Sequence, residues 1–323
     1  MELKFDFKEQ VELANKKIRS YIRETYLEKS LYLSEIGEAD VYCKMENLQV
    51  TGSFKIRGAL NAVLSLPKDM LTNGVVTAST GNHGSAVAFA SKIVGISSIV
   101  FVPVNAPQSK IDAIKRHGSE IQYHGSDCVE AELFAREFAN KYNKMYISPY
   151  NDRMIIYGQG TIGTELTKQL DKIDAIFITV GGGGLISGIA GYLKSIKSNI
   201  KVYGCSPENS NIMAQSVKVG KILNIPSLET ISEGSAGGVE PKAITFDLCK
   251  DLVDEWIAVT EDEIANSLKE FLQNQHSLIE GAAAVALASY KKKYKDLYGS
   301  NVVIVICGSN ISESILKQVL SNN

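Results

Sequence analysis

The sequence predicts an α/β fold with two lobes, each built on a mostly parallel sheet flanked by helices. Short apolar segments alternate along the chain with helical segments of ten or more residues, which is typical of a parallel sheet covered on both faces. The length of 323 residues also suits two packed lobes better than one core. We expect residues 65–150 to form the small domain, and residues 1–64 and 151–323 to form the large one.

The first part of the chain places a lysine near the start of a helix. Residues 8–29 are predicted to form an amphipathic surface helix, and residues 40–45 a strand. After a polar turn, Thr51 or Ser53 is expected to cap a helix whose first turn contains Lys55. The helix macrodipole favours anions there, so the lysine would lose part of its preference for charge and become a better nucleophile. An ordinary surface lysine after a cap fits this stretch equally well.

The small domain is predicted to repeat a unit of one strand and one helix, and a polar segment near residue 150 then returns the chain to the large domain. The expected strands cover residues 75–78, 98–103 and 120–123, and the expected helices cover residues 86–90, 109–117 and 129–142.

The large domain resumes with further strands and helices, and a long irregular segment has the glycine and proline content of loops that cover active sites. The expected strands are 175–180, 202–205 and 302–307, the helices are 155–169, 261–275 and 281–294, and the irregular segment is 206–241.

Composition excludes several classes of function. The net charge of −2 provides no basic field for nucleic acid, and no apolar run approaches the ~18 residues of a membrane span. The charged N-terminus has no apolar signal-peptide core. The five cysteines are scattered without a C-x-x-C pair, which favours reduced thiols over a zinc site or disulfides. We therefore expect a soluble cytoplasmic protein that binds neither nucleic acid nor membranes.

Four consecutive glycines, Gly181 to Gly184, follow a predicted strand and open a helix. Without Cβ atoms, several backbone N–H groups can approach one anion there. A tight strand-to-helix turn and a dinucleotide site are the alternatives. A single monoester phosphate is favoured over a dinucleotide by the order of residues in this run, G-G-G-G-L-I-S-G. In addition, no acidic residue ends a second strand at the spacing that binding a ribose needs.

Three segments together resemble the fold-type II pyridoxal-phosphate enzymes, and among them the threonine/serine dehydratases and serine racemases. They are T-G-S-F-K-I-R-G-A at residues 51–59, S-T-G-N-H-G at 79–84 and V-G-G-G-G-L at 180–185, and the similarity extends from about residue 10 to the C-terminus. The resemblance implies a tryptophan synthase β-like architecture, pyridoxal 5'-phosphate as cofactor, a small amino acid as substrate and a homodimer.

The resemblance also implies a role for each cofactor-binding position. Lys55 would hold the cofactor and remove the substrate's Cα proton, and Asn82 would bind the oxygen of the ring hydroxyl. Each position has an ordinary structural alternative: a turn residue for Asn82, a core residue for Phe54 and a small buried hydrophobe for Cys307. The implied cofactor-binding residues are Phe54, Lys55, Asn82, Gly181, Gly182, Gly183, Gly184, Leu185 and Cys307.

Cys307 occupies the position that faces the pyridine nitrogen in the family, where most of these enzymes carry a serine. A thiol can donate weakly to an unprotonated ring nitrogen, but unlike a carboxylate it would not keep that nitrogen protonated. The ring would then be a moderate electron sink. That suffices for β-elimination, and it makes aminotransfer an unlikely reaction for this chain.

Substrate-binding residues are expected in the second motif. Ser79, Thr80 and Gly81 lie at a predicted helix N-terminus, which suits a substrate carboxylate. His83 is either a further binding residue or a packed turn histidine. Serine racemases use a serine where Thr80 stands, as the acid/base opposite the lysine, so the resemblance makes Thr80 a catalytic candidate. Its β-methyl group restricts χ1 and crowds that face.

No metal site is predicted. The racemases and some relatives bind a divalent cation with acidic residues after the strand that corresponds to the one ending at Cys205. Here those positions are Ser206 and Ile212. The loop 233–240 also differs from the racemase pattern and is more similar to dehydratases of less common β-hydroxy amino acids, including those assigned to hydroxyectoine breakdown.

The resemblance therefore predicts an ammonia-lyase that dehydrates and deaminates a β-hydroxy-α-amino acid, with L-threonine or L-serine as the first candidates. The products would be a 2-oxo acid and ammonia. A serine racemase is the second interpretation, and a β-replacement synthase is the third. A binding protein without cofactor is a different class, and the intact Lys55, Asn82 and glycine run argue against it.

Overall fold

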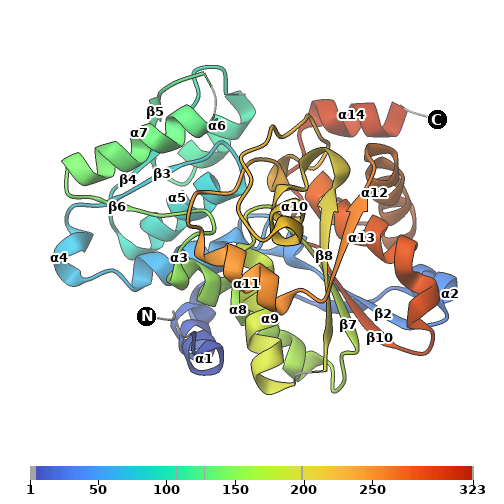
Figure 1. Cartoon of the computed structure of the whole chain (residues 1–323). Helices are drawn as coiled ribbons and strands as arrows, with labels where there is room; N and C mark the ends of the chain where they lie inside the picture. The colour runs from blue at the N-terminus through green and yellow to red at the C-terminus, as the bar shows by residue number, and fades with distance from the viewer. Residues whose placement is uncertain (1–4, 107, 127, 198, 322–323) are drawn as a thin grey trace.

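The computed structural model describes residues 5–106, 108–126, 128–197 and 199–321. Its strands form two separate sheets flanked by helices (Figure 1). This confirms the predicted α/β class with two mostly parallel sheets. The division of the chain into domains at residues 64/65 and 150/151 stays a prediction.

The larger sheet has six strands in the order β1-β2-β10-β7-β8-β9. All neighbouring pairs are parallel except β1 with β2, which is antiparallel. The last strand of the chain therefore lies between one of the first strands and β7. The bounds are β1 Leu27–Lys29, β2 Asp40–Lys44, β7 Ala175–Thr179, β8 Lys201–Pro207, β9 Glu255–Val259 and β10 Asn301–Val305.

Helices cover both faces of this sheet, with α8, α9 and α11 on one side and α12 and α13 on the other (Figure 1). Helix α13 packs on β7, β8 and β10, and α9 packs on β7. The bounds are α1 Phe7–Ile18, α2 Leu31–Gly37, α3 Lys55–Leu64, α8 Arg153–Gln169, α9 Gly184–Ile196, α10 Ile212–Val219, α11 Ile244–Leu252, α12 Glu261–Gln275, α13 Gly281–Lys293 and α14 Glu313–Ser321.

The smaller sheet has four parallel strands in the order β5-β4-β3-β6. Helix α7 packs on β3, β4 and β6, while α5 contacts β3, β4, α6 and α3. The bounds are α4 Lys68–Leu71, β3 Val75–Ala78, α5 Asn82–Val94, β4 Ser98–Val102, α6 Gln108–Lys115, β5 Glu120–Tyr123, α7 Cys128–Lys141 and β6 Met145–Tyr146.

The prediction of one helix over residues 8–29 was wrong. Helix α1 ends at Ile18, and a 3-10 turn, η1 (Arg19–Tyr21), follows it. The strand β1 then pairs with β2 at the edge of the large sheet. Backbone hydrogen bonds to a sheet edge are tertiary contacts, so the local periodicity of this segment could not reveal them.

The prediction of an irregular segment over residues 206–241 was also partly wrong, because it contains α10. Ile212, Met213 and Ser216 are buried on this helix, which packs on α11. Gly220 ends it at φ +81°, a conformation that glycine adopts without strain. The remainder of the segment contains the end of β8 and the short 3-10 turns η3 (Glu208–Ser210) and η4 (Glu233–Ser235).

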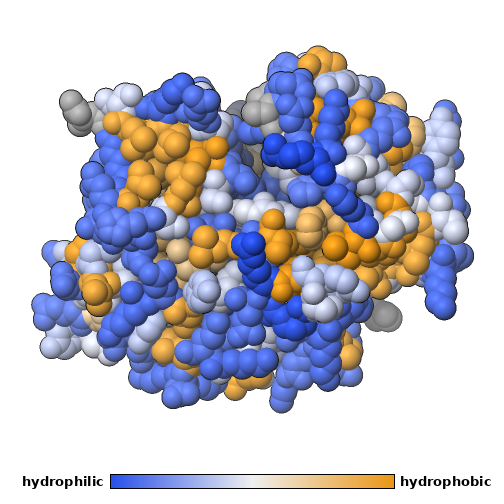
Figure 2. Space-filling model, turned by 180° about the vertical axis from the view of Figure 1, so that it is seen from behind, coloured by the Kyte–Doolittle hydropathy of each residue, from blue (hydrophilic) through white to orange (hydrophobic). Residues whose placement is uncertain are grey.

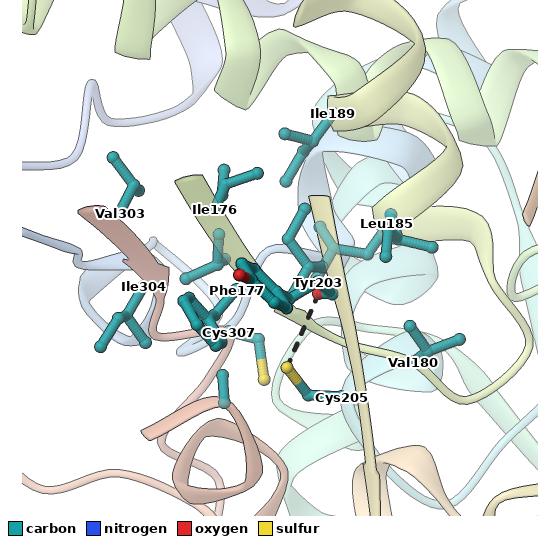
Figure 3. Close-up of a cluster of buried hydrophobic side chains, with 14 of the residues drawn as sticks. Ile176, Phe177, Val180, Leu185, Ile189, Tyr203, Cys205, Val303, Ile304 and Cys307 are labelled. Atoms are coloured by element: carbon teal, nitrogen blue, oxygen red, sulfur yellow. Dashed lines mark hydrogen bonds between the residues drawn. The ribbon is translucent and has the colours of Figure 1, made fainter. Parts of the chain in front are cut away.

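The core of the large sheet supports the glycine run. Phe177 on β7 stacks on Tyr203 of β8, with ring centroids 4.3 Å apart and planes 8° apart. Val180 and Leu185 flank the four glycines and pack into the same cluster (Figure 3). Because such cores are close-packed, the loop at the end of β7 starts from a rigid base.

On the surface, the rear face shows several groups of hydrophobic residues between hydrophilic ones (Figure 2). Tyr26, Leu31 and Tyr298 are the most exposed of the large hydrophobic side chains, at 73%, 71% and 75%. In the described part of the chain, no helix is both long enough and apolar enough to cross a bilayer.

Candidate active site

A cavity lies where the N-termini of α3 and α9 meet the C-terminal ends of β7 and β10. It brings together every residue that the sequence assigned to cofactor binding: Phe54, Lys55, Asn82, Gly181, Gly182, Gly183, Gly184, Leu185 and Cys307. Residues that the sequence did not single out also line it: Tyr150, Thr179, Gly234, Ser235, Glu280 and Ala282. Ligand sites at the carboxyl ends of parallel strands are common in α/β folds.

Lys55 is the first residue of α3, as predicted, but the predicted cap is wrong. Phe54 is the N-cap residue, without a side-chain cap hydrogen bond, and the hydroxyls of Thr51 and Ser53 have no partner. Main-chain contacts hold this turn instead. Phe54 N donates to Cys307 O at 3.1 Å, and Ser53 forms a β-bridge with Gly308. The end of β10 therefore fixes the start of the lysine helix.

The amine of Lys55 is buried, and this environment disfavours its charged form. Its Nζ donates to Pro149 O at 2.8 Å and lies 5.2 Å from the centroid of the Phe54 ring. Burial lowers the pKa of Lys55 to about 8, and the nearby Cys307 and Glu280 partly oppose this effect. A substantial fraction of the amine is therefore neutral near neutral pH.

The glycine run forms a cradle that side chains would fill. A Cβ on Gly182 would lie 2.4 Å from the Tyr150 ring, and one on Gly181 would lie 2.8 Å from Ser235 O. Gly183 has φ +86°, and Gly184 is the first residue of α9. Backbone N–H groups at a helix N-terminus attract a phosphate, so the cradle fits a phosphorylated cofactor.

Asn82 belongs to a hydrogen-bonded group that includes a buried carboxylate. Its Nδ2 donates to both oxygens of Glu280, at 2.9 and 3.0 Å. Its Oδ1 accepts from Asn310 Nδ2 at 2.6 Å, and Asn310 N donates to Glu280 at 3.1 Å. Burial raises the pKa of Glu280, although these donors oppose it. The site therefore contains a buried carboxyl group held by three hydrogen bonds.

Cys307 follows β10 and is 3% exposed. Its Sγ lies 4.0 Å from Glu280 Oε1. Burial, reinforced by the charge of Glu280, raises the pKa of the Cys307 thiol well above its usual value, so the thiol stays protonated. The site thus presents a neutral donor at this position.

The predicted substrate residues lie in the turn between β3 and α5 and in the first turn of α5. Ser79, Thr80 and Gly81 are half-buried, and Gly81 N donates to Ser79 Oγ at 3.1 Å. His83 is buried, with Nε2 3.0 Å from Ile147 O. Burial and the charge of Lys55 lower the pKa of His83 to about 3, so the ring is neutral and donates to this carbonyl. The contact favours the packed-histidine interpretation.

The two positions that lack the expected metal ligands are built into the protein interior. Ser206 is buried, and its hydroxyl donates to Val180 O at 3.3 Å. Ile212 opens α10 and is also buried. Within the described residues, no group of three or more histidine, cysteine, aspartate or glutamate side chains could hold a metal ion.

Tyr150 and Glu280 are the principal site residues that sequence reasoning missed. Tyr150 packs against Gly182 and Gly184, and its hydroxyl accepts from Glu240 N at 2.8 Å. Glu280 is the N-cap of α13, directly before the sequence Gly-Ala-Ala-Ala. The sequence signal that could have pointed to Glu280 is a carboxylate directly before a helix of small residues, because small residues let the start of that helix lie close to a cavity.

Comparison with known proteins agrees with this geometry. A family model for pyridoxal-phosphate dependent enzymes matches residues 18–308. The L-threonine ammonia-lyase of Thermotoga maritima is 37% identical over 313 residues, which is 97% of this chain and 78% of the relative.

Solved structures give the same result. The processed form of threonine deaminase isoform 2 from Solanum lycopersicum matches with a TM-score of 0.93 and 34% identity, covering 98% of this chain and 87% of the other. Maize serine racemase matches with a TM-score of 0.90 and 31% identity, covering 97% and 96%. The chain therefore belongs to the fold-type II pyridoxal-phosphate-dependent enzymes, in the family of threonine dehydratases and serine racemases.

Proposed function

We propose that this enzyme dehydrates and deaminates a β-hydroxy-α-amino acid, L-threonine or L-serine, to a 2-oxo acid and ammonia. The observation that carries the proposal is the Lys55 amine, with its pKa lowered to about 8, in the same cavity as the glycine cradle. Similarity to a threonine ammonia-lyase along 97% of the chain supports it.

Each site residue has a proposed role. Gly181 to Gly184 hold the cofactor phosphate, and Asn82 binds the ring hydroxyl. Pyridoxal phosphate, when bound, supplies an electron-withdrawing ring that makes the substrate's Cα–H bond acidic. The N-terminus of α5, with Ser79 and Gly81, receives the substrate carboxylate.

Lys55 moves the protons. Its neutral amine accepts the proton from Cα, and the resulting ammonium donates a proton to the departing β-hydroxyl, which leaves as water. The released enamine tautomerises and is hydrolysed to the 2-oxo acid and ammonia. The neutral Cys307 thiol does not keep the ring nitrogen protonated, which favours elimination over reactions that need a long-lived carbanion.

A serine racemase is the second candidate, because maize serine racemase has the same fold at 31% identity. Racemisation needs an acid/base on the face opposite Lys55, and Thr80 is the hydroxyl that the second motif offers there. A dehydratase for a less common hydroxy amino acid is the third, supported by the sequence of the loop 233–240.

Product analysis tests the proposal. The holoenzyme is incubated with a panel of β-hydroxy amino acids, and 2-oxo acid, ammonia and the enantiomer of the remaining substrate are measured. We expect 2-oxo acid from L-threonine or L-serine, and none from Lys55→Ala. Normal turnover by Lys55→Ala, or D-serine formed faster than pyruvate, would contradict the assignment.

The expected homodimer and the cytoplasmic location are also proposals. Tyr26, Leu31 and Tyr298 are exposed apolar side chains of the kind that interfaces cover, which supports self-association. Light scattering after size-exclusion chromatography would give the mass in solution, and a monomeric mass at micromolar concentration would contradict the dimer.

A further inference from the structure

A cluster of charged side chains is buried beneath the helix that carries Lys55. Lys44 at the end of β2, Glu46 in η2 (Glu46–Leu48), Arg57 on α3 and Glu165 on α8 form it, and we call it the buried charge cluster. All four side chains are at most 1% exposed. None of them lines the cofactor cavity as the structure describes it.

The guanidinium of Arg57 uses four of its five N–H donors within this cluster and the fifth on Thr161. Nε and Nη2 donate to the two oxygens of Glu46 at 2.8 and 2.7 Å. Nη1 and Nη2 donate to the two oxygens of Glu165 at 2.7 and 2.8 Å. The remaining Nη1 hydrogen goes to Thr161 Oγ1 at 3.1 Å. Paired bidentate bonds of this kind fix direction as well as distance.

The three N–H donors of the Lys44 ammonium also all have hydrogen-bond acceptors. Its Nζ donates to Glu165 Oε2 at 2.6 Å, to Thr25 O at 2.8 Å and to Gln169 Oε1 at 2.9 Å. Two buried cations therefore balance two buried anions. Arg19 adds a partly exposed contact of 2.6 Å to Glu165 at the edge of the cluster.

Such a cluster is a poor way to gain stability alone. Removing charges from water costs several kcal/mol per ion, and apolar side chains of similar volume often give equal or greater stability. The cluster does fix the position of α3 relative to α8, because α3 cannot slide or rotate against α8 without breaking several directed hydrogen bonds. Apolar packing alone would resist such small shifts less strongly.

Arg57 lies in the same helix turn as Lys55, so fixing the position of Arg57 also affects the position of Lys55. Residues two apart on a helix point in nearly opposite directions, about 200° around the axis. Lys55 points into the cavity, and Arg57 therefore points into the interior on the other side of the same turn. Fixing the guanidinium fixes the first turn of α3.

Helix α8 connects this turn to the phosphate cradle. A Cβ on Gly158 of α8 would lie 2.6 Å from the Cα of Gly58 on α3, and one on Gly188 of α9 would lie 2.6 Å from Gly160 N of α8. The three helices thus pack with their backbones in close approach, side by side in Figure 1. The distance from Lys55 to the start of α9 is therefore set through α8, together with the main-chain contacts that hold the start of α3 to the end of β10.

We propose that Arg57 and Glu165 are positioning residues that hold α3 against α8, and so keep the Lys55 amine at the distance from the α9 cradle that bound pyridoxal phosphate requires. The proposal rests on the proposed function for its kinetic consequence. Its structural consequence, the orientation of the bound cofactor, does not depend on which substrate is used.

The test uses Glu165→Gln, which keeps the shape of the side chain but leaves one buried positive charge in excess. Thr161→Val removes one neutral contact to Arg57. If Glu165→Gln does not fold, the result for Thr161→Val decides whether the positioning role holds. Leu268→Ala, in the buried part of α12, is the control for a loss of stability alone. Melting temperature, affinity for pyridoxal phosphate, visible circular dichroism per bound cofactor, kcat and KM are measured for each holoenzyme.

We expect Glu165→Gln to lower the visible circular dichroism per bound cofactor to about half, since a loosely held chromophore loses its fixed orientation. Its kcat should fall by about tenfold or more while KM changes by less than about threefold. Thr161→Val should shift both quantities in the same direction by a smaller factor. Leu268→Ala should lower the melting temperature without changing either.

The positioning role would be overturned if folded Glu165→Gln, or Thr161→Val, had the dichroism and kcat of the wild type. It would also be overturned if Leu268→Ala changed the dichroism and kcat as much as those variants do. Failure of the proposed function has a different signature. The wild type would then release no 2-oxo acid from any substrate, while the dichroism and cofactor affinity would still report on the position of Lys55.

Discussion

Replacing Glu280 with glutamine should lower the pKa of Lys55 below its native value of about 8. Burial depresses the pKa of this amine, and the neighbouring Cys307 and Glu280 oppose the depression, Glu280 through its negative charge. Glutamine keeps the length of the side chain and an acceptor for Asn82, but it removes the negative charge. The neutral amine should then be more abundant at a given pH.

The expected magnitude follows from the titration of one amine. At pH 7.5 a lysine with a pKa of about 8 is neutral for about a quarter of the time, against about one part in a thousand at the usual 10.5. Glu280→Gln can therefore raise the neutral fraction at pH 7.5 by at most about fourfold, and it leaves the plateau at high pH unchanged.

The assay is the association of pyridoxal phosphate with apoprotein, followed by stopped-flow absorbance between pH 6 and pH 10. Only the neutral amine attacks the cofactor aldehyde, so the rate should rise with pH and reach half its plateau near pH 8 in the wild type. The midpoint should be lower in Glu280→Gln. A lysine peptide in solution corrects for the ionisation of the cofactor, and Lys55→Ala should show no such phase.

A wild-type rate that is still rising at pH 10 would refute the argument, because the Lys55 pKa would then not be depressed. A midpoint that moves to higher pH in Glu280→Gln would show that Glu280 does not stabilise the ammonium.

Three further predictions concern the cradle, the missing metal ligands and the second motif. Gly183→Ala should weaken pyridoxal phosphate binding by about tenfold or more, because its Cβ would lie 2.8 Å from Cys249 Sγ and its φ of +86° disfavours alanine; equilibrium titration of apoprotein measures this. Chelation by EDTA should leave the rate of 2-oxo acid release largely intact, since Ser206 and Ile212 cannot replace carboxylates for a hard cation. Thr80→Ser should raise any racemase side activity while keeping dehydration within about tenfold, because it frees χ1 of the hydroxyl, and chiral chromatography beside pyruvate release measures both.

Each of these has a result that contradicts it. Gly220 also has a positive φ, +81°, but a Cβ there would meet open space. An equal loss of cofactor affinity in Gly220→Ala would therefore show that the effect of Gly183→Ala does not come from filling the cradle. Activity lost in EDTA and restored by magnesium or calcium would establish a metal site elsewhere. An unchanged D-serine yield in Thr80→Ser would show that the threonine methyl does not limit racemisation.

The sequence by itself determined the fold class, and its resemblance to a known family pointed to positions that line one cavity. Strand and helix periodicity is set by near neighbours, so local patterns suffice for the fold class. The site positions were found because three motifs together resemble one family. Lys55 starts its helix and Gly184 starts α9. The predicted cap at Thr51 or Ser53 was wrong because a main-chain contact from Cys307 replaces it.

Only the tertiary structure decided which distant residues complete the site. Glu280 reaches Asn82 across 198 positions of sequence, and Arg57 meets Glu165 across 108. These contacts exist because α3 packs on α8, and because the N-terminus of α13 meets that of α5. Strand order follows from the packing of whole elements, and no local pattern encodes it. The environment that lowers the Lys55 pKa therefore becomes visible only once the sheet is assembled.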